Sequence, residues 1–145
     1  IIAYGSKLKP ITVFENVAKF IDELPILFIC AALQNGISKF YHCHELIHKE
    51  SNRLLEIKKI LMQIGIKCKI TKNNVMTIYG KNKIEIKNKS IFVNTKGDHR
   101  ICMSSVILAL VTGIKIKIKD VGTVNTSFPG FISLIKNLGG RIVIN

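Results

Sequence analysis

The chain has 145 residues, of which 48% are hydrophobic, so it can form one domain with a buried core but not two large domains. Its formal net charge of +13 suggests an anionic ligand, which could be nucleic acid, an acidic membrane, or a small phosphorylated or carboxylated substrate, but many lysines alternate with isoleucine and are explained as well by the solvated face of a strand. Aromatic residues are only 7% of the chain and Trp is absent, which argues against a protein that stacks single-stranded nucleic acid on aromatic side chains.

The first half of the chain alternates strand-like and helix-like patterns. Asp22 is a good N-cap for an almost wholly apolar segment, and Pro25 is tolerated in the first turn of a helix. A later helix carries its apolar side chains on one stripe, which is typical of an outer helix. In chain order we predict a strand over 11–14, a buried helix from Asp22 to Gly36, a strand over 37–43, an amphipathic helix from Ser51 to Gly65, and strands over 67–71 and 75–79 joined by a turn at Asn73-Asn74.

The second half repeats this order. Matching landmarks lie about 76 residues apart, as Asp22 and Asp98 do, which indicates a duplicated supersecondary unit. In chain order we predict strands over 83–87 and 91–94, a buried helix from Asp98 to Gly113, a strand over 114–119 in which Ile alternates with Lys, a helix from Ser127 to Gly139, and a strand over 141–144. The predicted fold class is therefore α/β (α+β), with two β-α-β-α-β-β units at residues 8–82 and 83–145.

Residues His44-Glu45-Leu46-Ile47-His48 spell H-E-x-x-H, the signature of zinc proteases. That chemistry needs both imidazoles on one face of a helix and a third metal ligand further along the chain. Here the motif falls between a predicted strand and a predicted helix, so the two imidazoles need not converge. His99 could in principle be the third ligand, but nothing around it supports that role. We therefore expect no bound zinc and do not favour the zinc-protease alternative.

The cysteines and the apolar segments indicate the cell compartment. The four cysteines show no short pairing such as C-x-x-C, and Cys30 and Cys102 lie in apolar runs. We expect them to be reduced core residues of a cytoplasmic protein. The apolar stretches are shorter than the roughly 20 residues that a bilayer requires, so no membrane span is expected. The sequence begins Ile-Ile-Ala without Met, so we expect a fragment of a longer chain.

Four ordered segments resemble the EPSP synthase family, whose members are 3-phosphoshikimate 1-carboxyvinyltransferases. The stretch from Glu45 to Leu54 is similar to the family's E-L-R-x-K-E-S-D-R-L segment. The other three segments are I-D-E-L-P at 21–25, D-H-R-I-C-M at 98–103 and T-S-F-P-G-F at 126–131. The sister family that acts on UDP-N-acetylglucosamine shares the fold but lacks the D-H-R and S-F-P patterns, so it is a distant second.

The resemblance implies the inside-out α/β barrel of the enolpyruvyl transferases, with β-α-β-α-β-β units in two domains and the active site between them. By this comparison residues 1–145 are the C-terminal part of the C-terminal domain, and a missing N-terminal domain is needed to close the site. The implied reaction transfers the enolpyruvyl group of phosphoenolpyruvate to shikimate 3-phosphate, without metal or organic cofactor. The full-length enzyme is expected to be a cytoplasmic monomer of the shikimate pathway that binds neither nucleic acid nor membrane, and the fragment alone to be inactive.

The resemblance also implies a site. Asp22 matches the catalytic Asp that holds the hydroxyls of shikimate 3-phosphate and acts as a base, although an N-cap role would explain it as well. Glu50 matches the carboxylate that moves a proton to and from the methylene carbon, and Lys49 is implied to contact shikimate 3-phosphate. Arg53 and Arg100 match the two arginines that hold phosphoenolpyruvate. Because Asp22, Arg53 and Arg100 each lie near a predicted helix start, these helix ends could converge on one anion-binding edge.

Two positions depart from the family pattern. Asn52 stands where the family has Asp, and Ile47 stands where it has Arg, so an ion pair next to Lys49 and Glu50 is expected to be absent. The rival hypothesis is a non-catalytic binding domain, or the remnant of a split gene, that merely keeps the fold. Whether the upstream gene sequence encodes the missing domain in frame would separate the two hypotheses.

Overall fold

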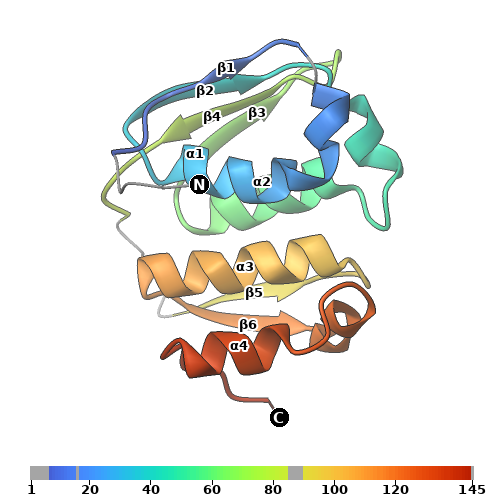
Figure 1. Ribbon diagram of the computed structural model, residues 1–145. Coiled ribbons are helices and arrows are strands. Elements are labelled where there is room, and N and C mark those ends of the chain that lie inside the picture. The colour runs from blue at the N-terminus through green and yellow to red at the C-terminus, as the bar shows by residue number, and fades with distance from the viewer. Residues whose placement is uncertain (1–6, 16, 85–89, 145) are drawn as a thin grey trace, which may run out of the picture.

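The computed structural model describes residues 7–15, 17–84 and 90–144. Figure 1 shows a four-stranded sheet that packs against helices α1 and α2, followed by α3, a two-stranded sheet and α4 in further layers. Among the described residues, no helix combines the length and the apolar character needed to cross a membrane.

The first half of the chain forms the four-stranded sheet and its helices. The sheet has the order β1-β2-β4-β3, with β1 parallel to β2, and β4 antiparallel to both of its neighbours. Asn74, whose φ is 54°, makes the predicted turn between the last two strands. The elements are β1 (Thr12–Val13), the 3-10 helix η1 (Val17–Glu23), α1 (Leu24–Ala32), β2 (Gly36–Phe40), the 3-10 helix η2 (Cys43–His48), α2 (Arg53–Gln63), β3 (Lys67–Ile70) and β4 (Met76–Gly80).

The second half contains β5 (Ser90–Asn94), α3 (His99–Thr112), β6 (Lys115–Lys119), η3 (Val121–Thr126) and α4 (Phe131–Asn137). β5 and β6 are parallel, so β5-α3-β6 repeats the strand-helix-strand arrangement of β1-α1-β2. The predicted strand over 141–144 is wrong: these residues have no regular secondary structure, because none of the described strands pairs with them. The predicted strand over 83–87 lies mostly outside the described residues, and the unit boundaries at 8–82 and 83–145 stay predictions.

The ends of α3 follow the sequence signals. The carboxylate of Asp98 accepts hydrogen bonds from the backbone N–H groups of Arg100 and Ile101 at 2.9 and 3.3 Å, which makes Asp98 the predicted N-cap. Gly113 follows the helix with a φ of 71°, a left-handed conformation that glycine adopts without strain. These two residues fix where α3 starts and stops.

The other three predicted N-caps are wrong, although α1 and α2 begin within two residues of the predicted positions. Asp22 lies in η1, and α1 begins at Leu24, because the Asp22 carboxylate binds side chains of other segments instead. The N-cap of α2 is Asn52 rather than Ser51, and α4 begins at Phe131, four residues after Ser127. The Asp22 and Ser51 side chains fail as caps because they bond to other segments instead.

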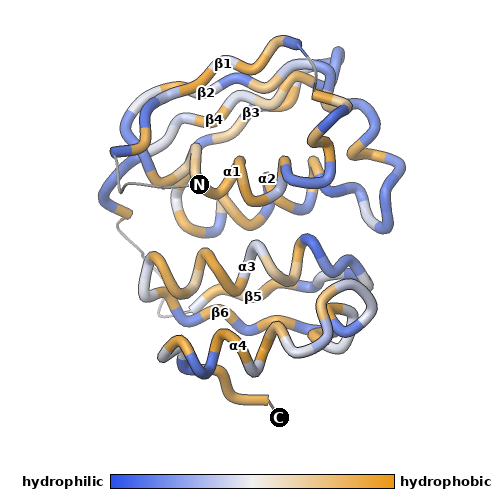
Figure 2. Tube along the Cα trace, in the orientation of Figure 1, coloured by the Kyte–Doolittle hydropathy of each residue, from blue (hydrophilic) through white to orange (hydrophobic). Residues whose placement is uncertain are grey.

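One buried core joins the two halves. Leu24 and Phe28 of α1 and Ile101 and Leu108 of α3 are fully buried and belong to the same cluster. Figure 2 shows hydrophobic positions along both helices, which fits their place between other layers. The predicted apolar stripe of α2 is confirmed, since all four of its residues are buried: Leu54, Ile57, Leu61 and Ile64. This packing holds the starts of α1, α2 and α3 in a fixed relation.

Three of the four thiols are buried: those of Cys43, Cys68 and Cys102. Burial raises the pKa of the Cys43 and Cys102 thiols to about 11 and that of the Cys68 thiol to about 12. Because a neutral thiol is a poor nucleophile and a poor metal ligand, these residues act as small apolar side chains at neutral pH.

Candidate active site

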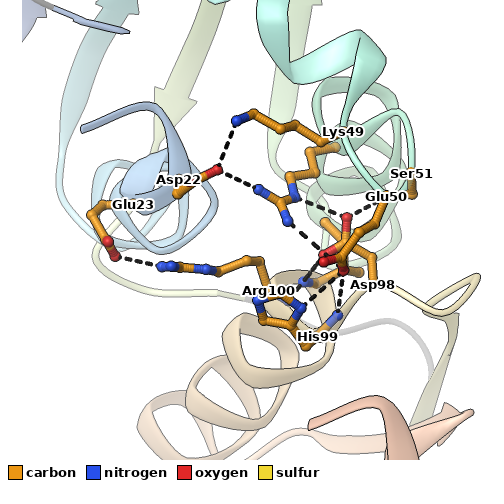
Figure 3. Close-up of polar contacts among 10 residues, drawn as sticks. Asp22, Glu23, Lys49, Glu50, Ser51, Asp98, His99 and Arg100 are labelled. Atoms are coloured by element: carbon orange, nitrogen blue, oxygen red, sulfur yellow. Dashed lines mark hydrogen bonds and ion pairs between the residues drawn. The ribbon is translucent and has the colours of Figure 1, made fainter. Parts of the chain in front are cut away.

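A pocket of about 300 Å³ lies where the N-terminal ends of α1, α2 and α3 meet (Figure 3). All five site residues predicted from the sequence line this pocket, together with one residue that was not predicted. The lining residues are Asp22 before α1, Lys49, Glu50 and Arg53 at the start of α2, and His99 and Arg100 at the start of α3. Helix N-termini present free N–H groups and the positive end of the helix dipole, so this location favours anions.

Arg53 is the buried centre of the site, with a side chain only 3% exposed. Its Nε donates to Oδ2 of Asp98 at 2.8 Å, and one terminal nitrogen donates to Oδ1 of Asp22 at 2.8 Å. Oε2 of Glu50 lies 3.9 Å from the other terminal nitrogen. A guanidinium this deeply buried needs such partners, because an unpaired buried charge is strongly destabilising. Arg53 therefore ties the start of α2 to the segments that precede α1 and α3.

Asp98 is fully buried beneath this guanidinium. In addition to its bond with Arg53, its Oδ2 accepts a hydrogen bond from the Ser51 hydroxyl at 2.9 Å. Burial alone would raise the pKa of Asp98, but Arg53, Ser51 and the backbone N–H of Ile101 outweigh burial and hold the pKa below its ordinary value of 3.8. Asp98 is consequently an anion at neutral pH and fixes both Arg53 and the first turn of α3.

Asp22 binds two cations. Its Oδ1 lies 3.1 Å from the Lys49 ammonium and 2.8 Å from the Arg53 guanidinium. Burial raises the pKa of Asp22, but these two cations have the larger combined effect and hold it below its ordinary value of 3.8. The Asp22 carboxylate is half-exposed, so a ligand in the pocket can reach it while it remains charged.

Glu50, which lies between η2 and α2, is positioned by His99, the first residue of α3. Its Oε2 lies 2.9 Å from Nδ1 of His99 and accepts a hydrogen bond from the His99 backbone N–H at 3.3 Å. The Glu50 side chain is half-exposed, whereas His99 is mostly buried. His99 thus holds a carboxylate at the pocket surface, where the carboxylate can exchange protons with a bound molecule.

The Arg100 side chain is more exposed than that of Arg53 and has a different carboxylate partner. Its terminal nitrogen lies 2.9 Å from Oε2 of Glu23, and the two side chains are 30% and 55% exposed. Its backbone N–H is held by the carboxylate of Asp98. The Arg100 guanidinium is therefore the more accessible of the two, on a backbone that is fixed.

The two departures from the family pattern do not remove the contacts that hold Lys49 and Glu50. Oδ1 of Asn52 accepts a hydrogen bond from the Leu55 N–H at 3.0 Å, so the amide caps α2. Ile47 packs against the hydrophobic core. Lys49 and Glu50 are positioned by Asp22 and His99 respectively, and these contacts do not require the ion pair that the family pattern would place beside them.

The H-E-x-x-H residues form the 3-10 helix η2 rather than an open loop. A 3-10 helix has three residues per turn, so His44 and His48 lie about a third of a turn apart instead of on one face. Both histidines are exposed. In the part of the chain that the structure describes, the possible metal-ligand group is Glu50, Asp98 and His99, which includes neither of them. A cation there would also have to compete with Arg53 for Asp98.

We expect the purified chain to bind no stoichiometric zinc, because His44 and His48 do not converge and the acidic group is already paired with Arg53. Elemental analysis after dialysis measures this directly. One zinc per chain that disappears in a His44→Ala variant would contradict the expectation.

A second pocket of about 250 Å³ lies beside β1 and α1. Its lining is almost wholly apolar and includes Leu8, Phe20 and Phe40, with Lys9 as the one charged side chain among the lining residues. It lacks the converging charges that would bind a small anion.

Sequence reasoning missed two contributions to the site. His99 was considered only as a zinc ligand, and Asp98 only as an N-cap, whereas each also holds a side chain of the preceding unit. Their position beside Arg100 in the D-H-R segment was the available signal, but the sequence does not say that α3 begins next to α2.

Comparisons with known proteins bear on the family and the fold of the chain. The family model of EPSP synthase (3-phosphoshikimate 1-carboxyvinyltransferase) matches residues 1–135. The 3-phosphoshikimate 1-carboxyvinyltransferase of Campylobacter jejuni subsp. doylei is 40% identical over 138 residues, which cover 95% of this chain and 31% of the relative. That of Leptospira biflexa is 34% identical over 140 residues, again covering 95% of this chain and 31% of the relative. The chain thus spans about a third of the length of these curated relatives.

Solved structures confirm the predicted fold class. An EPSP synthase from Acinetobacter baumannii superimposes with a TM-score of 0.83 at 35% identity, over 96% of this chain and 32% of that protein. The enolpyruvyl transferase NikO from Streptomyces tendae superimposes with a TM-score of 0.66 at 14% identity, over 95% of this chain and 30% of that protein, a likeness that shows the fold alone. By its sequence match and its fold, the chain belongs to the EPSP synthase family.

Proposed function

We propose that this chain carries part of the active site of a 3-phosphoshikimate 1-carboxyvinyltransferase. In that reaction the enolpyruvyl group of phosphoenolpyruvate is transferred to the 5-hydroxyl of shikimate 3-phosphate, and phosphate is released. The observation that carries the proposal is that all five residues matching the family's site line one pocket. They come from three segments of the chain, so only the fold brings them together.

The reaction makes specific demands on the site. In the addition step the hydroxyl oxygen bonds to C2 of phosphoenolpyruvate, while the hydroxyl loses a proton and the methylene carbon C3 gains one. In the elimination step C3 returns a proton and the bond between C2 and the phosphate oxygen breaks. The site must therefore supply a proton acceptor near the hydroxyl, a group that gives and takes a proton at C3, and cations around one carboxylate and two phosphates.

Asp22 is the proposed partner of the sugar hydroxyls. It is anionic at neutral pH, since Lys49 and Arg53 overcome the effect of burial and lower its pKa. A carboxylate with a lowered pKa accepts hydrogen bonds well but is a weak base. We expect Asp22 chiefly to orient the 5-hydroxyl, and to become more basic when a substrate phosphate draws Lys49 away from it.

Glu50 is the proposed proton carrier for C3. Its carboxylate lies at the pocket surface, and His99 holds it there through Nδ1 and the backbone N–H. A group that moves a proton to carbon must be held within hydrogen-bond reach of that carbon, and fixed positioning of this kind supports such a role.

The two arginines are proposed to bind phosphoenolpyruvate in different ways. Arg100 is accessible, so its guanidinium fork can take a carboxylate or a pair of phosphate oxygens directly. Arg53 is committed to Asp22 and Asp98, and offers the ligand mainly the terminal nitrogen that lies 3.9 Å from Glu50.

The pocket alone has too little positive charge for its proposed substrates. Its three cations, Lys49, Arg53 and Arg100, already face four carboxylates, which are Asp22, Glu23, Glu50 and Asp98. Two phosphates and a carboxylate need further cations, which we propose come from the N-terminal domain of the full-length enzyme. That enzyme is proposed to act as a cytoplasmic monomer.

We expect the full-length enzyme that contains this chain to release phosphate from phosphoenolpyruvate and shikimate 3-phosphate, and the isolated chain to show no turnover. A coupled phosphate assay on both proteins measures this. A well-folded but inactive full-length protein would favour the non-catalytic alternative. Turnover by the isolated chain would contradict the proposed need for a second domain.

A further inference from the structure

Two consecutive carboxylates before α1 pair with two different arginines. Asp22 lies 2.8 Å from Arg53, and Glu23 lies 2.9 Å from Arg100 (Figure 3). Glu23 is the N-cap residue of α1, but its side chain makes no capping hydrogen bond. Its carboxylate extends instead to Arg100, 77 positions further along the chain.

The two ion pairs differ in how readily another anion can replace the carboxylate. Arg53 is 3% exposed and binds a second carboxylate, that of Asp98, so it cannot leave without exposing buried charge. Arg100 and Glu23 are 30% and 55% exposed, and Glu23 is the side chain that the described residues offer to the Arg100 guanidinium. Pairs between exposed side chains are weak, so another anion can replace Glu23.

We propose that Glu23 is an internal competitor for Arg100. The Glu23 carboxylate binds the Arg100 guanidinium when no ligand is bound, and a ligand that bears a phosphate or a carboxylate binds Arg100 by displacing the Glu23 carboxylate. This inference rests on the proposed function and adds a residue that sets the affinity of the anion site. The exchange moves only side chains, because the Arg100 backbone N–H stays bound to Asp98 at 2.9 Å.

The strength of the Glu23–Arg100 ion pair determines how much the affinity for an anion should change when Glu23 is replaced. An exposed ion pair changes an equilibrium constant by about 1.4- to 5-fold. Glu23→Gln keeps the length and polarity of the side chain but removes its charge, so the affinity for an anion should rise by that factor. Glu15→Gln is the matched control, since Glu15 is exposed and does not line the pocket. Because salt screens exposed charges, the difference between Glu23→Gln and the unchanged chain should shrink as ionic strength rises.

Titration of the isotope-labelled chain with inorganic phosphate, read by NMR at the side-chain N–H of Arg100, tests the inference. We expect phosphate to bind about 1.4- to 5-fold more tightly to Glu23→Gln and equally to Glu15→Gln. Equal or weaker binding by Glu23→Gln would overturn the inference, and so would a failure of both proteins to bind phosphate at Arg100. Circular dichroism confirms that the variants are folded.

Kinetics of the full-length enzyme separate this inference from the proposed function. In Glu23→Gln the KM for phosphoenolpyruvate should fall while kcat is unchanged, a split that a purely structural role would not produce. An active enzyme with an unchanged KM overturns the role of Glu23 alone. An enzyme without transfer activity contradicts the proposed function, and the phosphate titration then decides on Glu23 independently.

Discussion

Replacing Asp98 with Asn lowers the free energy of unfolding by about 3 kcal/mol, the lower end of what breaking a buried ion pair costs. The Asp98 side chain is fully buried, and it binds the Arg53 guanidinium and the Ser51 hydroxyl while it caps α3. The variant leaves Arg53 buried with Asp22 as its remaining close carboxylate. Partial pairing of this kind places the loss near the lower end.

Urea unfolding at neutral pH measures this loss, provided that the slope of the transition is unchanged. Asp120→Asn is the matched control, because Asp120 is exposed, makes no side-chain cap, and has a positive φ that Asn also tolerates. A loss for Asp98→Asn no larger than that for Asp120→Asn would mean that the buried pair does not hold the site together.

Replacing Glu50 with Gln in the full-length enzyme should lower kcat by on the order of 100- to 10,000-fold, the usual contribution of a positioned acid or base. The amide keeps the shape of the side chain and can still contact His99, but it cannot carry the proton to and from C3. Because Glu50 is not proposed to hold either phosphate, the KM values should change much less.

Steady-state kinetics with both substrates varied test the role of Glu50. Glu45→Gln is the control, because Glu45 is exposed in η2 and does not line the pocket. A Glu50→Gln enzyme with near-normal kcat would remove Glu50 from the proton-transfer role, and a large rise in KM alone would assign it to binding.

Local sequence signals predicted the fold well where distant partners leave the local bond in place, as at Asp98, whose Oδ1 caps α3 while its Oδ2 binds Arg53 and Ser51. The apolar stripe of α2 and the cap of α3 at Asp98 are as expected, because burial and capping follow from residue type and spacing. Asp22 and Ser51 also have good N-cap side chains, yet neither caps a helix, since Asp22 binds Arg53 and Ser51 donates to Asp98. No spacing rule gives contacts between residues 31 or 47 positions apart.

The site itself could be predicted only in part. The resemblance supplied Asp22, Lys49, Glu50, Arg53 and Arg100, and the structure brings these five residues to one pocket. The roles of His99 and Glu23 could not be predicted, because each depends on how the start of α3 faces another helix start. The strand over 141–144 failed for a related reason: a β-branched apolar run forms a strand only beside a partner strand.

The most direct measurement of the central claim is the KM for phosphoenolpyruvate in an Arg100→Ala variant of the full-length enzyme. Removing a charge-assisted hydrogen bond from the anion site should raise this KM on the order of 10- to 100-fold. The matched control is Arg141→Ala, which removes an exposed arginine that does not line the pocket and should leave KM unchanged. If the Arg100→Ala enzyme is folded by circular dichroism and its KM for phosphoenolpyruvate equals that of Arg141→Ala, the assignment of the anion site to the start of α3 is contradicted.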